Sequence, residues 1–308
     1  MPWQPLTVPN SLQLGSERTV RDALLAGRAL LCSAGLTDPH LESRLLLQHV
    51  LQISHAALYA HPEKRLSATE SSVFEALITR RARREPYAYL VGAQSWLDFE
   101  LCVDRNVLIP RPETEQLVQL AVEVLEDGRR ATVEWAPVVV DVGTGSGAIA
   151  IAVARAFPEA SVFATDVSVG ALSTAAANVA RLAPGRVTLL AGDLLEPIPY
   201  RAALLVANLP YIPSGEIGQL EPELRYEPCQ ALDGGRDGLE AIRALLEEAP
   251  LALAPGAHIV LECGHNQARA IEALALSDPR YAAVRIVRDL GSVERFVGLQ
   301  VCQEGMGH

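Results

Sequence analysis

Val140-Asp141-Val142-Gly143-Thr144-Gly145-Ser146-Gly147 lies where an apolar run gives way to the helical pattern of Ala148 to Ala156. The preceding run, Val138-Val139-Val140, is typical of a buried strand. Glycines let the backbone turn tightly and approach a ligand closely, and the free N–H groups of a helix N-terminus can bind that ligand. This stretch therefore predicts a strand, a ligand-binding loop and a helix, in that order.

The alternation of strand and helix continues along the rest of the chain. We expect further strands near residues 162–164, 187–190, 204–206, 258–261, 284–287 and 296–299, and helices near residues 171–182, 239–252 and 267–276. With the strand at 138–140, this pattern predicts an α/β fold built on a doubly wound, mostly parallel sheet of seven strands. In such sheets ligands bind at the carboxyl ends of the strands.

The N-terminal part of the chain has a different pattern. From Thr19 to about Arg84, apolar residues recur every three or four positions, which predicts a small bundle of helices. Asp38-Pro39 and Ser67-Ala68-Thr69-Glu70 carry residues that are typical of helix starts. Strand signals are scarce in this part, so we expect it to form a separate helical domain.

Residues 86–108 are rich in aromatic and β-branched residues, among them Tyr87 and Tyr89, and this composition predicts a β-hairpin. A helix then runs through Val124, with Pro112 and acidic residues at its start. We therefore divide the chain into a helical domain at 1–85, a hairpin linker at 86–108 and an α/β domain at 109–308.

The composition excludes several classes of protein. Of 308 residues, 49% are hydrophobic and 20% are charged, as in ordinary globular proteins. No apolar run reaches the roughly 18 residues that cross a bilayer, and Met1-Pro2-Trp3-Gln4 does not resemble a secretory signal, so we expect a cytoplasmic protein without membrane contact. The five cysteines occur singly, without metal-ligand spacing, so we expect buried, reduced thiols and no metal site.

The net charge is −11, and Lys64 is the only lysine. Proteins that bind nucleic acid without sequence preference neutralise its phosphates with basic side chains, so we expect no stable nucleic-acid binding here. An acidic chain is instead compatible with a cationic small molecule or a basic protein partner.

Asn208-Leu209-Pro210-Tyr211 follows the apolar run at 202–207 and so lies at the carboxyl end of a predicted strand. The Asn208 side chain and a neighbouring backbone carbonyl can accept two N–H bonds from a planar amine or amide, while Tyr211 packs against its plane. Clusters of this kind also mark simple turns, so the motif gains its meaning from the residues that accompany it.

The glycine loop and two further strand ends predict a nucleotide site. Asp166 ends the second strand, where a carboxylate can accept both hydroxyls of a ribose, and Asp193-Leu194 offers a carboxylate and an apolar wall for an adenine. Two cofactors compete for this site. Gly143, Gly145 and Ala148 fit the dinucleotide fingerprint, which predicts a nicotinamide cofactor and hydride transfer.

Asp141 favours the other cofactor, S-adenosylmethionine. A carboxylate two residues before the first glycine would repel a pyrophosphate but attract a cationic, sulfonium-bearing amino acid. No arginine placed after the glycines could bind a second phosphate. Together with the Asn208 motif, this favours S-adenosylmethionine over a nicotinamide. The residues expected to bind it are Asp141, Gly143, Thr144, Gly145, Ser146, Gly147, Asp166, Asp193, Leu194 and Asn208.

Eight segments match one protein family in the family's order: residues 34–47, 84–92, 108–115, 141–149, 208–212, 226–228, 231–239 and 261–264. The run Pro110-Arg111-Pro112-Glu113-Thr114-Glu115 is the most telling, because related enzymes that act on a ribosomal protein differ there. Through these segments the chain resembles the bacterial N5-glutamine methyltransferases of class-I peptide chain release factors (the PrmC/HemK family).

The resemblance implies a class I methyltransferase fold with a helical N-terminal domain that recognises the substrate. It implies transfer of a methyl group from S-adenosylmethionine, leaving S-adenosylhomocysteine, to the amide nitrogen of the glutamine in the Gly-Gly-Gln motif of release factors. Arg111 and Glu113 are candidates for shaping the substrate pocket. Release factors are then the expected partners, and we expect a monomer.

The resemblance also assigns roles to the Asn208 motif. The Asn208 side chain and the Leu209 carbonyl would accept the two amide hydrogens, Pro210 would fix the turn, and Tyr211 would pack on the amide face. The family usually has proline where this chain has Leu209, but leucine provides the same carbonyl.

Two alternatives remain open at this point. Asn-Leu-Pro-Tyr also resembles the motif of adenine dimethyltransferases that act on ribosomal RNA, so the runner-up is an adenine N-methyltransferase acting on RNA or DNA. That function predicts a basic groove, which the net charge does not favour. The non-enzymatic alternative is a cofactor-binding scaffold, against which the complete glycine loop, Asp166 and Asn208 argue.

Overall fold

The structure is a computed structural model that describes residues 18–131, 136–199 and 201–303. The segment Met1-Pro2-Trp3-Gln4 lies outside the described residues. The helices are α1 (Val20–Ser33), α2 (Pro39–Leu51), α3 (His55–Ala60), α4 (Ala68–Ala82), α5 (Tyr87–Val91), α6 (Pro112–Ala131), α7 (Ala148–Ala156), α8 (Val169–Leu182), α9 (Glu240–Ala252) and α10 (Ala268–Leu276).

The strands are β1 (Ala93–Trp96), β2 (Phe99–Cys102), β3 (Val138–Val142), β4 (Ser161–Asp166), β5 (Val187–Ala191), β6 (Ala202–Ala207), β7 (Leu253–Glu262), β8 (Tyr281–Arg288) and β9 (Glu294–Val301). Three short 3-10 helices lie between β6 and α9: η1 (Ile217–Gln219), η2 (Pro222–Tyr226) and η3 (Cys229–Ala231). The chain divides into two compact units, one containing the residues up to Gly92 with Glu221–Tyr226, the other Ala93–Leu220 with the residues from Glu227 onward.

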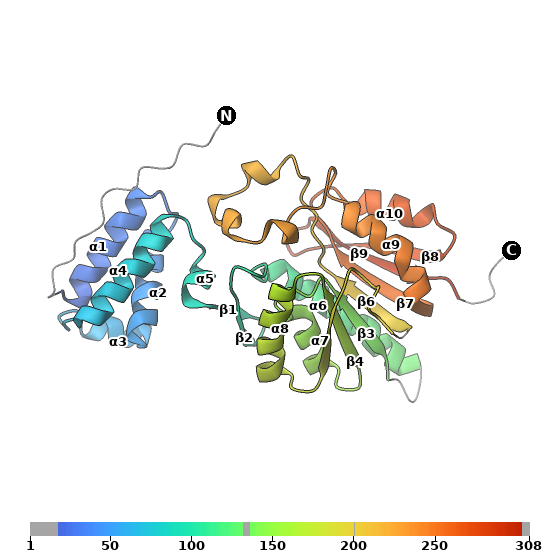
Figure 1. Cartoon of the computed structure of the whole chain (residues 1–308), viewed down its shortest axis with the longest axis horizontal. Helices are drawn as coiled ribbons and strands as arrows, with labels where there is room; N and C mark the ends of the chain where they lie inside the picture. The colour runs from blue at the N-terminus through green and yellow to red at the C-terminus, as the bar shows by residue number, and fades with distance from the viewer. Residues whose placement is uncertain (1–17, 132–135, 200, 304–308) are drawn as a thin grey trace. The chain divides into compact units, whose positions relative to one another are not determined.

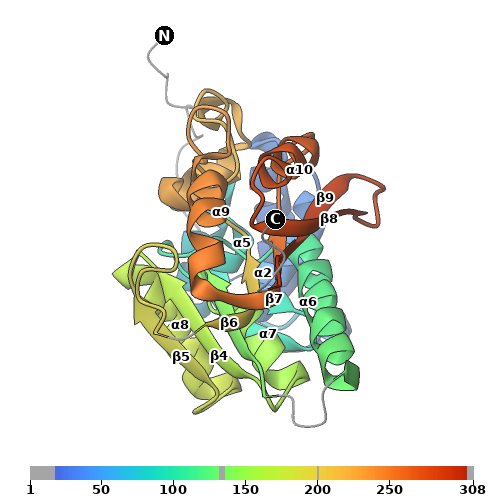
Figure 2. The same cartoon turned by 90° about the vertical axis from the view of Figure 1, so that its right-hand side faces the viewer.

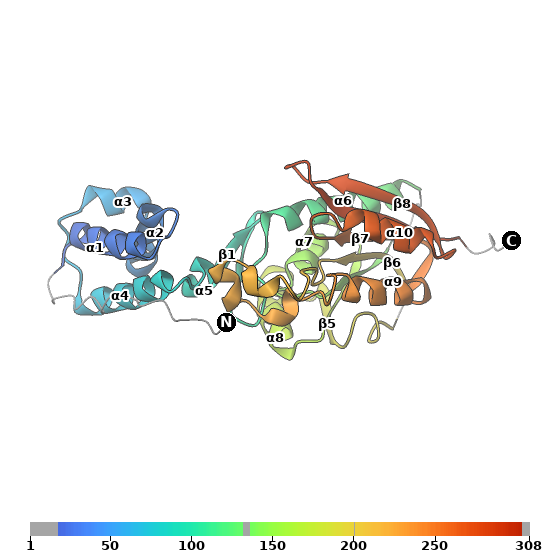
Figure 3. The same ribbon diagram turned by 90° about the horizontal axis from the view of Figure 1, so that it is seen from above.

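The first unit is a bundle in which α1, α2 and α4 pack against one another (Figure 1, Figure 3). Helices α2 and α4 begin where the sequence predicted. Asp38 caps α2, and Ser67 forms a capping box with Glu70 at the start of α4. Leu31, Leu46 and Phe74 are each at most 1% exposed in its core. The predicted helical bundle is therefore confirmed.

The prediction of a hairpin over the whole of 86–108 is wrong at its start, because residues 87–91 form helix α5. The helix follows Pro86 and ends at Gly92, whose φ of 71° lies in the left-handed region that favours glycine. Leu90 is buried in the core of the helical bundle. Packing against α2 and α4 thus overrides the strand preference of Tyr87 and Tyr89. The hairpin itself is β1 and β2.

The second unit is built on the predicted seven-stranded sheet, in the order β5-β4-β3-β6-β7-β9-β8. The pairs from β5 to β7 are parallel, whereas β9 is antiparallel to both β7 and β8. From β3 the chain continues to β4 and β5 on one side, and it then crosses to β6 on the other side of β3. The carboxyl ends of β3 and β6 therefore flank the point where the strand order reverses, which is where such sheets bind ligands.

Helices cover both faces of this sheet (Figure 2). Helix α6 packs on β6 and β7, and α7 and α8 continue the same layer over β3, β4 and β5. Helices α9 and α10 form the other layer. The core between that layer and the sheet contains Val140, Leu205, Leu245, Ile259 and Ile271, none of which has any exposed surface. The doubly wound fold is therefore confirmed.

Two compositional expectations can be compared with the described residues. All five cysteines are free, but Cys32, Cys102 and Cys229 are exposed and Cys302 is partly exposed, so the expectation of buried thiols is confirmed for Cys263 alone. Cys102 is the last residue of β2, and Cys229 is the first residue of η3. Within 18–131, 136–199 and 201–303, no helix combines the length and the apolar character that crossing a bilayer requires.

Candidate active site

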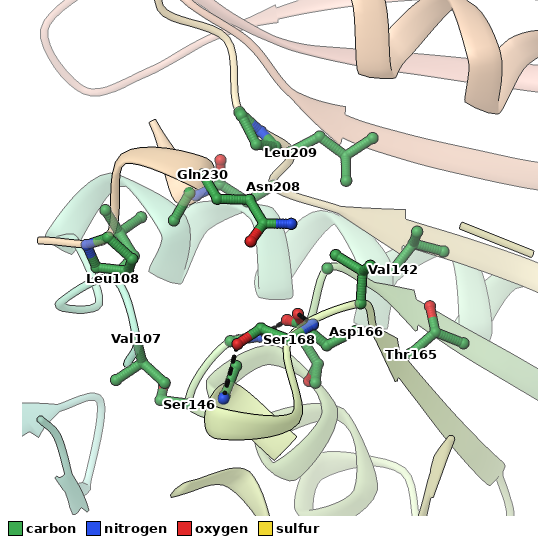
Figure 4. A pocket seen from close by; sticks show the side chains of 18 of the residues that line it. Val107, Leu108, Val142, Ser146, Thr165, Asp166, Ser168, Asn208, Leu209 and Gln230 are labelled. Carbon is green, nitrogen blue, oxygen red and sulfur yellow. Dashed lines mark hydrogen bonds between the residues drawn. The ribbon is translucent and has the colours of Figure 1, made fainter. Parts of the chain in front are cut away.

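A cavity of about 320 Å³ lies at the carboxyl ends of β3, β4 and β6. Figure 4 shows the Asn208 side chain projecting into it, on the side opposite Asp166 and Ser168. Of the residues predicted for the site, the cavity is lined by Arg111, Gly143, Thr144, Gly145, Ser146, Asp166, Asp193, Leu194, Asn208, Leu209 and Pro210. Asp141, Gly147, Tyr211 and Glu113 lie outside this lining.

The glycine loop between β3 and α7 is held tightly to the neighbouring strand. Gly143, Gly145 and Gly147 have φ values of 73°, 55° and 83°, in the left-handed region that favours glycine. The N–H groups of Gly143 and Thr144 both donate to the carbonyl of Thr165 at 2.9 Å. The loop backbone is therefore fixed along the cavity wall.

Asp141 lies beneath the loop and is 1% exposed. Its Oδ2 accepts the Thr144 hydroxyl at 2.6 Å and the N–H of Ala150 at 3.1 Å, whereas its Oδ1 has no hydrogen-bond partner among the described residues. Burial raises the pKa of this carboxyl to about 7, against the lowering effect of those two bonds. Asp141 thus links the loop to the start of α7 and carries one unused acceptor.

Asp166 is positioned by the loop as well as by its strand. Its Oδ2 accepts the N–H of Gly145 at 2.9 Å, and its Oδ1 accepts the N–H of Ser168 at 2.8 Å. Because each carboxylate oxygen has a second lone pair, both can still accept a hydroxyl. Asp193 is exposed, and Leu194 next to it adopts a φ of 41° while its carbonyl accepts the Thr165 hydroxyl at 2.9 Å.

Asn208 directly follows β6, and its amide has a defined direction. Its Nδ2 donates to Thr114 Oγ1 at 3.2 Å, and the Thr114 hydroxyl donates to Glu262 Oε2 at 2.8 Å. With the nitrogen bonded inside the protein, the amide oxygen is the atom that can face a ligand. The Leu209 side chain, 5% exposed, packs over Gly143, so that a Cβ on this glycine would lie 3.0 Å from Leu209 Cδ2.

Pro210 and Tyr211 are enclosed by backbone from the connection that follows. A Cβ on Gly234 would lie 2.6 Å from the Pro210 carbonyl oxygen, and one on Gly238 would lie 2.2 Å from that of Tyr211. The same Tyr211 oxygen accepts the side-chain N–H of Gln267 at 2.8 Å. Burial raises the pKa of the Tyr211 hydroxyl to about 12, so this side chain is neutral.

Arg111 and Glu113 come from the run that begins α6, and they have different surroundings. Arg111 lines the cavity, and its Nη2 lies 2.5 Å from Glu227 Oε1, whose other oxygen accepts the N–H of Ile109 at 3.0 Å. Glu113 is exposed and lies in the first turn of α6, where a carboxylate is favoured by the helix dipole.

Sequence reasoning gave no role to three residues that the structure places here: Thr114, Glu227 and Glu262. All three are at most 6% exposed. Each belongs to a segment that carried the family resemblance, but a polar residue's burial cannot be seen from the sequence alone. Within the described parts of the chain, no group of three or more potential metal ligands is present.

The fold and the cavity define a methyltransferase of class I. Residues 139–218 match a family model described as a methyltransferase domain, and residues 22–92 match the PrmC N-terminal domain. Three relatives are named release factor glutamine methyltransferase. The one from Bordetella pertussis is 42% identical over 87% of this chain and 97% of its own length. The one from Geobacter sulfurreducens is 37% identical over 91% and 96%, and the one from Gloeobacter violaceus 43% over 78% and 80%.

These relatives are matched over 80–97% of their own length, and both units of the chain are matched. The chain therefore belongs to the release factor glutamine methyltransferase family.

Proposed function

We propose that this enzyme transfers the methyl group of S-adenosylmethionine to the side-chain amide nitrogen of the glutamine in the Gly-Gly-Gln motif of class-I peptide chain release factors. The observation that carries the proposal is the direction of the Asn208 amide. Its nitrogen is bonded to Thr114, which leaves its oxygen at the cavity wall as an acceptor for a substrate N–H. An acceptor at this position suits an amine or amide nitrogen, and the family names a glutamine.

The residues around the glycine loop fit S-adenosylmethionine. Asp166 offers two carboxylate oxygens to a ribose diol, and Leu194 offers an apolar surface to an adenine. The buried Oδ1 of Asp141, which has no partner among the described residues, would give the methionine end of the site a negative field when this carboxyl is ionised. When bound, this cofactor supplies an electrophilic methyl group on a sulfonium, and S-adenosylhomocysteine is the product.

The charges of the cavity argue against a dinucleotide. Among the described residues that line it, Arg111 is the one cation, and Arg111 is paired with Glu227. No lining side chain is therefore free to neutralise the two negative charges of a pyrophosphate. This supports the preference for S-adenosylmethionine over a nicotinamide cofactor.

An amide nitrogen is a poor nucleophile, because its lone pair is delocalised into the carbonyl. Two acceptors, the Asn208 side-chain oxygen and the Leu209 carbonyl, would hold both amide hydrogens and direct the nitrogen at the methyl carbon. They would also stabilise the positive charge that develops on nitrogen during the displacement. Positioning of this kind can supply about 7–11 kcal/mol, so no general base is needed before methyl transfer. The proton leaves afterwards, to water.

A protein substrate suits this chain better than a nucleic acid. The net charge of −11 favours a basic partner, such as a factor that works on the ribosome, and disfavours binding to phosphates. The helical unit, which matches the PrmC N-terminal domain, is the natural surface for recognising the release factor. We place the reaction in the cytoplasm and expect the enzyme to act as a monomer.

The test is transfer of label from methyl-labelled S-adenosylmethionine to a purified class-I release factor. A second copy of the factor, with the glutamine of its Gly-Gly-Gln motif replaced by alanine, is the control. Label on the first and none on the second is the expected result. Label on both copies would contradict the proposed target. Label on ribosomal RNA in a parallel reaction, with none on either copy, would support the adenine methyltransferase instead.

A further inference from the structure

Three polar side chains meet behind the acceptor of the proposed site. Asn208 is the first residue after β6, and Glu262 is the last residue of β7. These strands are parallel neighbours that pair Ala207 with Leu261, so Asn208 and Glu262 leave the sheet side by side. Thr114 reaches them from the first turn of α6. Thr114 is 4% and Glu262 1% exposed, so this group is shielded from water.

The hydrogen bonds between these side chains have a fixed direction. A threonine hydroxyl carries a single hydrogen, and Thr114 gives it to Glu262 Oε2 at 2.8 Å. Towards Asn208 the same hydroxyl can then only accept, and it accepts Nδ2 at 3.2 Å. An Asn208 amide turned by half a rotation would place its oxygen against the Thr114 oxygen with no hydrogen between them. Because the ionised Glu262 carboxylate can only accept, it sets the direction of both hydrogen bonds, from Asn208 to Thr114 and from Thr114 to Glu262.

We propose that Glu262 and Thr114 are positioning residues that hold the Asn208 amide with its oxygen, not its nitrogen, towards the substrate. This inference rests on the proposed function, because it concerns the same acceptor. Neither residue touches the reacting atoms. Both act through Asn208. Without them, either the oxygen or the nitrogen of the Asn208 amide could point into the cavity.

The surroundings of Glu262 determine when it is ionised. The facing charges are Arg295 on β9, which favours the carboxylate, and Glu113 on α6, which disfavours it. The neutral Tyr211 hydroxyl and the Cys263 thiol also lie near this carboxyl. Burial raises the pKa of Glu262 to about 7 and outweighs the bond from Thr114 and the nearby Asn208 amide, which favour the charged form. A protonated Glu262 could donate to Thr114 and so release the Asn208 amide.

The test compares steady-state methylation of a release factor by the full-length enzyme and four variants. Glu262→Gln keeps the shape but lets the side chain donate as well as accept. Thr114→Val removes the hydroxyl, and Thr114→Ser restores it. Glu123→Gln changes an exposed glutamate on the same helix and is the control. Binding of S-adenosylmethionine is measured by calorimetry for each protein, to separate loss of the cofactor site from loss of positioning.

For Glu262→Gln and Thr114→Val we expect kcat to fall by about tenfold or more, with cofactor affinity within roughly threefold of the wild type. Thr114→Ser is expected to recover most of the kcat that Thr114→Val loses. The wild-type kcat, with both substrates saturating, is expected to fall as pH drops below about 7, and Glu262→Gln is expected to lose this acidic limb. A role in folding alone would not remove a limb from the pH profile.

Two other results would distinguish a failure of the positioning role from a failure of the proposed function. If the wild type is active and Glu262→Gln keeps both its kcat and its acidic limb, the positioning role is overturned while the proposed function stands. If the wild type methylates no release factor, the proposed function itself fails.

Discussion

The Nη2 of Arg111 lies 2.5 Å from Oε1 of Glu227, a residue 116 positions further along the chain. The Glu227 side chain is 2% exposed, and its other oxygen accepts the backbone N–H of Ile109. One carboxylate therefore fixes both the direction of the Arg111 side chain and the backbone that precedes α6. Arg111 lines the cavity, but its charge is neutralised by Glu227, so it is not a free cation.

This pair predicts that Arg111→Ala is destabilising. Removing Arg111 would leave the Glu227 carboxylate buried and uncompensated, a change that typically costs about 3 kcal/mol. Arg130→Ala is the matched control, because Arg130 and its partner Asp127 are 73% and 76% exposed. That change should cost about 0.5 kcal/mol or less. Urea unfolding followed by fluorescence measures both, and equal midpoints for the two variants would contradict the structural role of the pair.

The close approach of Gly234 to the Asn208 motif predicts a loss of activity without a loss of cofactor. In Gly234→Ala, the new Cβ would lie 2.6 Å from the Pro210 carbonyl oxygen and 2.8 Å from Tyr211 Cα, so the backbone of the motif must shift. A shift of this size should lower kcat by about 10²-fold. Affinity for S-adenosylmethionine should stay within about threefold of the wild type.

Gly215→Ala is the control for this prediction, since Gly215 lies in the same connection between β6 and α9. A Cβ on Gly215 would meet no atom of the described residues within 4 Å apart from its own chain neighbours, so this change should leave kcat unchanged. Steady-state kinetics measures kcat and calorimetry measures the affinity for S-adenosylmethionine. A Gly234→Ala variant with the kcat of the wild type would contradict the prediction.

The buried carboxyl of Asp141 predicts a pH dependence of stability. Its pKa is about 7 in the folded chain, against 3.8 for an unperturbed aspartate. Between these two pH values the folded state binds more protons, so the contribution of Asp141 is full below about pH 4 and is lost as pH rises towards 7. Asp141→Asn does not titrate and should escape this loss.

Thermal unfolding of the wild type and Asp141→Asn at pH 5 and pH 8 tests this. We expect the free energy of unfolding of the variant, relative to that of the wild type, to rise by at least about 1 kcal/mol between pH 5 and pH 8. A difference that does not change with pH would contradict a raised pKa. The variant should also bind S-adenosylmethionine more weakly, because it lacks the negative charge.

Periodicity and turn residues were enough to predict the seven strands and the helices that alternate with them. They failed at Tyr87–Val91, where residues with strand preference form α5 because the helical bundle offers Leu90 a buried position. Pro86 and Gly92, which bound this helix, were the available signal. Local residue preference cannot predict a contact with an element distant in sequence, and the contact of α5 with the helical bundle is such a contact.

Some residues of the candidate site could be predicted from the sequence and others could not. Asn208 and Asp166 could be placed at the cavity because each follows directly from a predicted strand end. Thr114 and Glu262 could not, since their contact spans 148 residues of sequence and depends on the register of β6 and β7. Asp141 was expected among the cofactor ligands, yet its side chain lies under the loop and bonds to Thr144 and Ala150. We therefore expect it to act on the cofactor through its charge and through the loop, and not by direct contact.

Tandem mass spectrometry of the release factor's Gly-Gly-Gln peptide, after reaction with the wild type and with Asn208→Ala, tests the central claim most directly. We predict one added methyl group on the side-chain amide of the glutamine after reaction with the wild type. Asn208→Ala should transfer it about 10²-fold or more slowly while still binding S-adenosylmethionine. A methyl group on any other residue, or equal rates for the two enzymes, would contradict the proposed mechanism.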